Sequence, residues 1–89
     1  MIYPEQIRAA RALLGLNQTQ LATLADVGVA TIKRIEVASG KIRGAAQTIW
    51  KIQTALEKAG VRFVDADENA GVGVRLKENQ DQPDSINSF

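Results

Sequence analysis

The chain has 89 residues, a formal net charge of +1, 45% hydrophobic residues, and neither cysteine nor histidine. This length suits one small domain with a single core. The absent residue types exclude disulfide frameworks, thiolate or imidazole zinc sites and nucleophiles activated by histidine. The remaining carboxylates of the predicted helices are scattered singly, so we expect no catalytic residue, no metal site and no cofactor.

Charge is unevenly distributed along the chain. Residues 1–64 carry nine Lys or Arg and four Asp or Glu, whereas residues 65–89 carry two and six. A basic first part suits a polyanion partner, although a solvated surface would show the same counts. No apolar run is long enough to cross a bilayer and the start lacks the layout of a signal peptide, so we expect no membrane association and a cytoplasmic location.

The first helix is predicted over residues 4–14. Pro4 suits a first turn, where an amide hydrogen is not needed, and Gly15 can adopt the left-handed conformation that ends a helix. Apolar residues recur at three- and four-residue spacing and predict a buried stripe of Ile7, Ala10, Leu13 and Leu14.

Two short helices are predicted next. Asn17 can cap a helix over residues 18–25, and Gln20 occupies the position that completes a capping box. A third helix is predicted from about Gly28 to Val37, with Ile32 and Ile35 directed inward. The residues that we expect on its outer side are Val29, Ala30, Lys33, Arg34 and Val37. Two glycines and a serine in residues 38–44 indicate a loop.

The last part of the chain changes its period. A fourth helix is predicted over residues 45–59, in which Trp50 is assigned to core or interface packing. Residues 61–65 and 72–77 are rich in alternating β-branched residues and predict a β-hairpin. The remainder is polar and acidic and predicts a disordered tail. We therefore divide the chain into residues 1–60, 61–77 and 78–89.

The stretch LNQTQLATLADVGVATIKRIE, residues 16–36, resembles the helix-turn-helix of the XRE family, the lambda- and 434-repressor and Cro-like DNA-binding domains. The residues that carry the resemblance are Gln18, Leu21, Ala22, Val27, Thr31, Ile32, Ile35 and Glu36. The resemblance covers about residues 5–60 and implies a mostly α, four-helix lambda-repressor-like domain, here followed by a C-terminal β-hairpin. The GVRL ending of that hairpin resembles a group of small bacterial XRE-type regulators.

The resemblance implies that the third helix enters the major groove of double-stranded DNA. Arg34 is the main predicted base reader, because a guanidinium can bond guanine O6 and N7 together, whereas Lys33 and Gln18 are assigned to phosphates. For each of these three side chains the alternative is a solvated group without a ligand. The complete predicted DNA-contact set is Gln18, Thr19, Gly28, Val29, Ala30, Thr31, Lys33, Arg34, Lys41 and Arg43.

Two departures and one match refine this resemblance. Gly28 stands where the family has a Ser or Thr cap, and Asp26 stands where it has a turn glycine, so the turn departs from the family pattern at two positions. The small groups at the start of the third helix can fit against thymine methyls. Arg11 and Glu36 match a family pair that joins the first helix to the end of the third, and we expect a salt bridge between them.

The sequence therefore predicts a homodimeric transcriptional regulator, a repressor rather than an activator, that binds a palindromic operator. Two short strands cannot hide the apolar residues of the hairpin, so this segment is the predicted dimer contact. The predicted interface residues are Val61, Phe63, Val72, Val74, Leu76 and Trp50. The alternative is a protein-interaction module, such as an antitoxin or anti-activator, whose hairpin or tail masks an unidentified protein partner.

Overall fold

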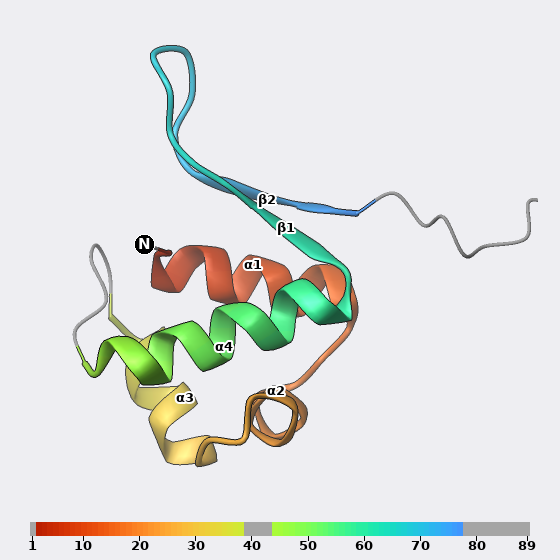
Figure 1. The fold of residues 1–89 in the computed structure, drawn as a ribbon, viewed down its shortest axis with the longest axis vertical. Helices are drawn as coiled ribbons and strands as arrows, with labels where there is room; N and C mark the ends of the chain where they lie inside the picture. The colour runs from red at the N-terminus through yellow and green to blue at the C-terminus, as the bar shows by residue number, and fades with distance from the viewer. Residues whose placement is uncertain (1, 39–43, 78–89) are drawn as a thin grey trace, which may run out of the picture.

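The computed structural model describes residues 2–38 and 44–77. Within these residues, helices are followed by an antiparallel hairpin (Figure 1). The elements are α1 (Pro4–Leu14), α2 (Gln18–Ala25), α3 (Val29–Glu36), α4 (Ala46–Ala59), β1 (Val61–Val64) and β2 (Gly73–Leu76). The predicted mostly α fold with a C-terminal hairpin is confirmed. The predicted tail, residues 78–89, and most of the predicted loop after α3 lie outside the described residues.

The ends of α1 and α2 follow from their capping residues. Gly15 ends α1 with φ 70°, a left-handed conformation that costs glycine little. At the start of α2, the Asn17 side chain accepts the Gln20 N–H at 2.7 Å, and the Gln20 side chain accepts the Asn17 N–H at 2.9 Å. This reciprocal capping box, predicted from the sequence, satisfies amide groups that the helix itself leaves unpaired.

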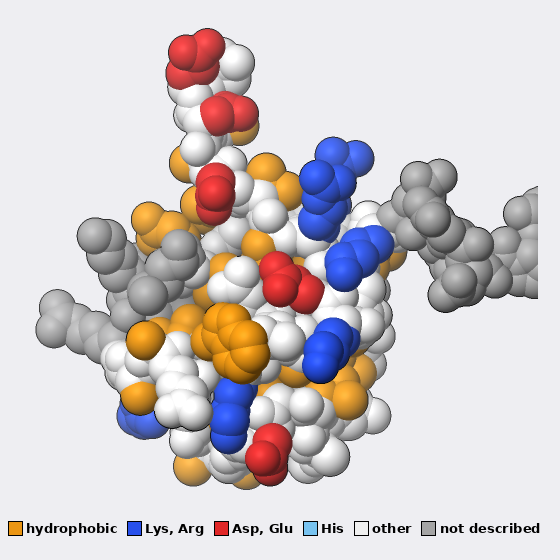
Figure 2. Space-filling view, in the orientation of Figure 1, with side chains coloured by type: hydrophobic (Ala, Val, Ile, Leu, Met, Phe, Trp, Pro, Cys, Tyr) orange, Lys and Arg blue, Asp and Glu red, His pale blue; other side chains and the backbone are white. Residues whose placement is uncertain are grey.

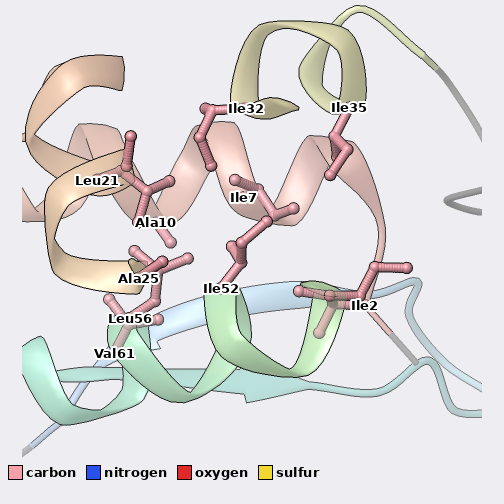
Figure 3. Close-up of a cluster of buried hydrophobic side chains, with 12 residues drawn as sticks. Ile2, Ile7, Ala10, Leu21, Ala25, Ile32, Ile35, Ile52, Leu56 and Val61 are labelled. Atoms are coloured by element: carbon pink, nitrogen blue, oxygen red, sulfur yellow. The ribbon is translucent and has the colours of Figure 1, made fainter. Parts of the chain in front are cut away.

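The four helices enclose a core that is dominated by isoleucine and leucine. Figure 3 shows Ile7 of α1, Ile32 of α3 and Ile52 of α4 converging at this core. The largest fully buried side chains are Ile7, Leu21, Ile32, Ile52, Leu56, Val61 and Pro4. Because Val61 already belongs to β1, the core continues past the end of the helices into the hairpin.

Two large apolar side chains of the helices, Leu13 and Trp50, are exposed. Leu13 is 44% exposed, although it was expected in the buried stripe of α1, and Gln6 on the same flank of that helix is buried instead. Gln6 and Leu13 are seven residues apart and therefore lie on the same side of α1. They differ in burial because the rest of the chain covers this side of the helix at Gln6 and not at Leu13. Trp50 was predicted to pack in the core or at an interface, and its exposure of 64% excludes the core and leaves the interface.

The hairpin lies on α1 and is tied to it by a side chain. In the antiparallel register, Phe63 pairs with Val74 and Val64 pairs with Gly73. The buried Gln6 side chain donates through Nε2 to the carbonyl oxygens of Val64, at 3.2 Å, and Gly73, at 2.9 Å. One amide group of α1 therefore holds both strands.

Beyond these contacts the hairpin projects from the helices (Figure 1). Its turn is closed by Asp67, whose Oδ1 accepts the N–H groups of Asn69 at 2.8 Å and Ala70 at 2.9 Å. Figure 2 shows acidic side chains gathered at this projecting end. We refer to the exposed residues 65–71 as the hairpin tip.

Candidate nucleic-acid interface

The turn between α2 and α3 forms despite its two unusual residues. Asp26 adopts φ 58° and ψ 49°, the left-handed conformation expected of the glycine that it replaces. Aspartate tolerates this conformation better than most residues because its short side chain can hydrogen-bond locally. Gly28 is extended, with φ −73°, and precedes α3 without a side-chain cap. Val27 packs against the core from between them, which fixes the position of the turn.

One side of α3 is buried and the opposite side is open. Ile32, Ile35 and Glu36 face the interior. The exposed residues recur at three- and four-residue spacing along the other side and form the α3 stripe, which consists of Ala30, Lys33, Arg34 and Val37. This stripe carries two positive charges beside small or apolar side chains. Val37, 84% exposed, extends it beyond the residues that the sequence singled out as DNA contacts.

The structure brings only part of the predicted DNA-contact set together on the surface. Thr19, Gly28 and Val29 line one open groove between α2 and the start of α3. Val29 is half-buried against the core, which corrects the expectation that its side chain points outward. Thr31 is also half-buried, whereas Ala30 is exposed. Lys41 and Arg43 lie outside the described residues.

The predicted salt bridge between α1 and α3 is present as a two-pronged contact. Arg11 Nε lies 2.8 Å from Glu36 Oε2, and Arg11 Nη2 donates to Glu36 Oε1 at 2.8 Å. The Glu36 side chain is 3% exposed and that of Arg11 is 20% exposed. The hydrogen bond to Glu36 raises the pKa of Arg11, so the guanidinium keeps its charge in this pair.

Further donors complete the surroundings of Glu36. Gln18 Nε2 donates to Glu36 Oε1 at 3.1 Å, and Arg8 Nη1 donates to the Glu36 carbonyl oxygen. Arg11 Nη1 also donates to the carbonyl oxygen of Leu16, at 3.0 Å, in the connection between α1 and α2. The network therefore fixes the end of α3 relative to both preceding helices.

The contact of Gln18 with Glu36 was not expected from the sequence, which assigned Gln18 to a phosphate. Its side chain is half-buried and already has a partner within the chain. Nothing in the local sequence predicts this contact, because the two residues are 18 positions apart, at the start of α2 and the end of α3. A phosphate contact of Gln18 would engage its remaining polar groups, including the backbone N–H at the start of α2.

The predicted dimer residues fall into three groups by burial. Val61 is fully buried within the chain and is not available to a second copy, so we withdraw it from the interface. Phe63 and Val74 are half-buried against the core. Val72, Leu76 and Trp50 are exposed.

The described part of the chain offers neither a metal site nor a membrane span. Within residues 2–38 and 44–77, no three acidic side chains are grouped closely enough to hold a metal ion. Over the same ranges, each helix is too short or too polar to cross a bilayer.

Comparison with known proteins matches the helices and the turn. A helix-turn-helix family model matches residues 7–59, which is more than half of the chain. A 45-residue segment, 51% of the chain, is 47% identical to part of a diaminopimelate decarboxylase of Zymomonas mobilis. That segment spans 11% of the length of the decarboxylase.

Proposed function

Because the chain belongs to the XRE-type helix-turn-helix family of DNA-binding regulators, we propose that it is a cytoplasmic, non-catalytic repressor that binds a palindromic operator as a homodimer. In this proposal α3 enters the major groove of double-stranded DNA. Each α3 reads only a few base pairs, and a second copy at a fixed spacing doubles the length of the site.

The observation that carries this proposal is the α3 stripe. An α-helix fits the width of the major groove, and a helix that approaches base edges needs small side chains at its near end and donors along its length. Ala30 supplies the small side chain, and Lys33 and Arg34 supply the donors. All three residues are exposed. The buried side of the same helix is fixed by the Glu36 network, so the stripe is presented in one orientation.

The two cations have different proposed roles. Arg34 is assigned to a guanine edge, because its planar fork can donate two parallel hydrogen bonds to O6 and N7. Lys33 is assigned to a phosphate, where a mobile point charge suffices. Small groups at Gly28 and Ala30, together with the half-buried Thr31, allow close approach to the base edges.

The test begins with selection of bound sequences from a random DNA pool by the intact chain. Binding of each variant is then measured on the selected site and on random DNA at several salt concentrations. Arg34→Ala should weaken binding to the selected site by about 1 to 3 kcal/mol and leave random DNA nearly unaffected. Lys33→Ala should weaken binding to both DNAs and reduce the salt dependence.

Lys58→Ala is the matched control, since Lys58 is an exposed cation on α4, away from the stripe. It should change neither measurement. Equal losses on both DNAs for Arg34→Ala would contradict the base-reading role. Failure to enrich any sequence from the pool would contradict the proposal that the chain binds a specific operator.

The homodimer is proposed because one short helix contacts too few base pairs for a tight operator. Val72 and Leu76 of the hairpin are exposed, and Trp50 adds exposed apolar surface on α4. Sedimentation of the intact chain at tens of micromolar, a range set by ordinary interface affinities, should give the mass of two chains. A monomer at that concentration would contradict this part of the proposal.

A further inference from the structure

β2 leaves an open edge on the hairpin. Its main contacts are with β1 and α1, whereas β1 also packs against α4 (Figure 1). The Lys77 N–H donates to the Gly60 carbonyl oxygen at 2.7 Å, so these two residues form a hydrogen-bonded pair. Hydrogen-bonded and non-hydrogen-bonded pairs alternate along an antiparallel ladder, which makes Phe63 and Val74 a non-hydrogen-bonded pair. By this alternation, the N–H and C=O groups of Val74 point away from β1. The described residues provide no partner for them.

Exposed apolar side chains flank this edge. Val72 is 37% exposed and Leu76 is 53% exposed, and each lies two residues from Val74. Residues at this spacing in a strand share one face of the sheet. The inner face of β2 therefore continues from the half-buried Val74 into an apolar surface that the helices leave uncovered.

The two ends of the hairpin carry opposite charges. The tip contains three exposed acidic residues, Asp65, Asp67 and Glu68, visible as the acidic group in Figure 2. The other end, which we call the hairpin base, contains three exposed cations, Arg62, Arg75 and Lys77. Arg62 and Arg75 are direct cross-strand partners, an arrangement of like charges that destabilises an isolated pair of strands.

We propose that a second copy of the chain pairs with this edge, β2 against β2, in antiparallel orientation and with Val74 on the two-fold axis. The inference deepens the proposed homodimer and rests on it. A two-fold axis makes the same surface patch meet itself, so paired edges must run in opposite directions. The tip of each copy then lies beside the base of the other.

This arrangement accounts for three features of the β2 edge. The outward N–H and C=O groups of Val74 bond to those of its copy, as in any antiparallel ladder. With Val74 opposite itself, Val72 lies opposite Leu76 of the second copy, and each covers exposed apolar surface of the other. The acidic hairpin tip of each copy lies beside the positively charged hairpin base of the other, which also relieves the repulsion between Arg62 and Arg75.

The test uses two variants that reverse charge at opposite ends of the hairpin. Asp65→Lys with Glu68→Lys reverses the tip and leaves Asp67, which closes the turn, unchanged. Arg75→Glu with Lys77→Glu reverses the base. The second variant gains an attractive pair between position 75 and Arg62 but loses the hydrogen bond from Lys77 Nζ to the Glu57 carbonyl oxygen. Recovery of the dimer in the mixture therefore shows that the hairpin of this variant is intact.

Sedimentation and native mass spectrometry are carried out on each variant and on their equimolar mixture, without DNA. Each variant alone places like charges together at both contacts, so its dimer dissociation constant should rise by at least about tenfold. The mixture should form a dimer of one chain of each kind, because both contacts are then complementary. Lys51→Glu, which reverses a charge on α4 beside Asp26 and away from the hairpin, should leave the dimer intact.

Either variant alone dimerising as the intact chain does, or a mixture that stays monomeric, would overturn the inference. Loss of the dimer with Lys51→Glu as well would overturn it, since the effect would then follow from net charge and not from the ends of the hairpin. Because these masses are read without DNA, failure of DNA recognition leaves the result for the hairpin unchanged. A monomeric intact chain that still selects one half-site would overturn the inference and leave DNA recognition standing.

Discussion

The helical body and the hairpin are fixed by contacts of different kinds. The body is closed by an apolar core and by a buried carboxylate that receives hydrogen bonds from Arg11 and Gln18. The hairpin has one fully buried residue, Val61, and is held to α1 by the two hydrogen bonds of Gln6. The body therefore satisfies its groups internally, whereas the hairpin keeps an edge and apolar side chains for another surface.

Truncation gives the largest expected effect, because it separates the two regions. A chain that ends at Gly60 loses Val61 and uncovers the core beneath the hairpin, so it should lose more than about 3 kcal/mol of its free energy of unfolding. A chain that ends at Lys77 should match the intact chain in stability, oligomeric state and operator affinity. Urea unfolding and sedimentation of both chains provide the measurement. Full stability of the shorter chain would show that the hairpin does not contribute to the core.

Breaking the network inside the body should have the next largest effect. Arg11→Ala leaves Glu36 buried with only Gln18 on its carboxylate, and we expect a loss of about 3 kcal/mol. Glu36→Ala should cost somewhat less, since the partly exposed Arg11 regains water. The double variant should lose less than the sum of the two, and simple additivity in urea unfolding would show that the pair does not interact.

A smaller effect is expected where the hairpin meets the body. Gln6→Ala removes both hydrogen bonds to the strand carbonyls and the acceptor of the Tyr3 N–H at the start of α1, at a cost of about 1 to 2 kcal/mol. The backbone amides of residues 61–64 should then exchange faster with deuterated water, while those of α3 should keep their protection. The replacement Gln20→Ala is the matched control, because it removes a glutamine side chain from the α2 cap and not from the hairpin. Equal acceleration in both regions would contradict a local role for Gln6.

The exposed ion pair of the body should have the smallest effect. Lys51 Nζ lies 3.9 Å from Asp26 Oδ2, and both side chains are open to water. Lys51→Ala should change the free energy of unfolding by less than about 0.5 kcal/mol, because solvent screens the pair. A loss comparable to that of Arg11→Ala, measured in the same urea series, would remove the contrast between buried and exposed charges.

Much of the fold was predictable because short-range signals set it. Asn17, Gln20 and Gly15 mark helix ends through groups only a few residues apart, and the structure has α1 and α2 at the predicted bounds. α3 is one residue shorter at each end than predicted, and α4 begins one residue later. These differences fall at helix ends, where capping groups are absent.

The parts that sequence reasoning missed depend on distant residues. Periodicity placed Leu13 inside, but it cannot tell which stretch of a helix flank a hairpin 50 residues later will cover. The burial of Gln6 and the contact between Gln18 and Glu36 have the same origin. Val61 was assigned to an interface for being apolar, whereas its place directly after α4 puts it in the core. The roles proposed for Arg34 and Lys33 remain predictions.

The Gln6 contact also bears on the order of events during synthesis of the chain. Gln6 is made before its acceptors, which lie 58 and 67 residues later. At a rate of about 5 to 20 residues per second, the ribosome adds the segment from the end of α4 to the end of β2 in about one to a few seconds. During that interval the helices are complete and the strand that we assign to self-pairing is not. We therefore expect a nascent chain to shape its DNA-facing helix before it can join a second copy, which limits premature association between neighbouring chains on one messenger RNA.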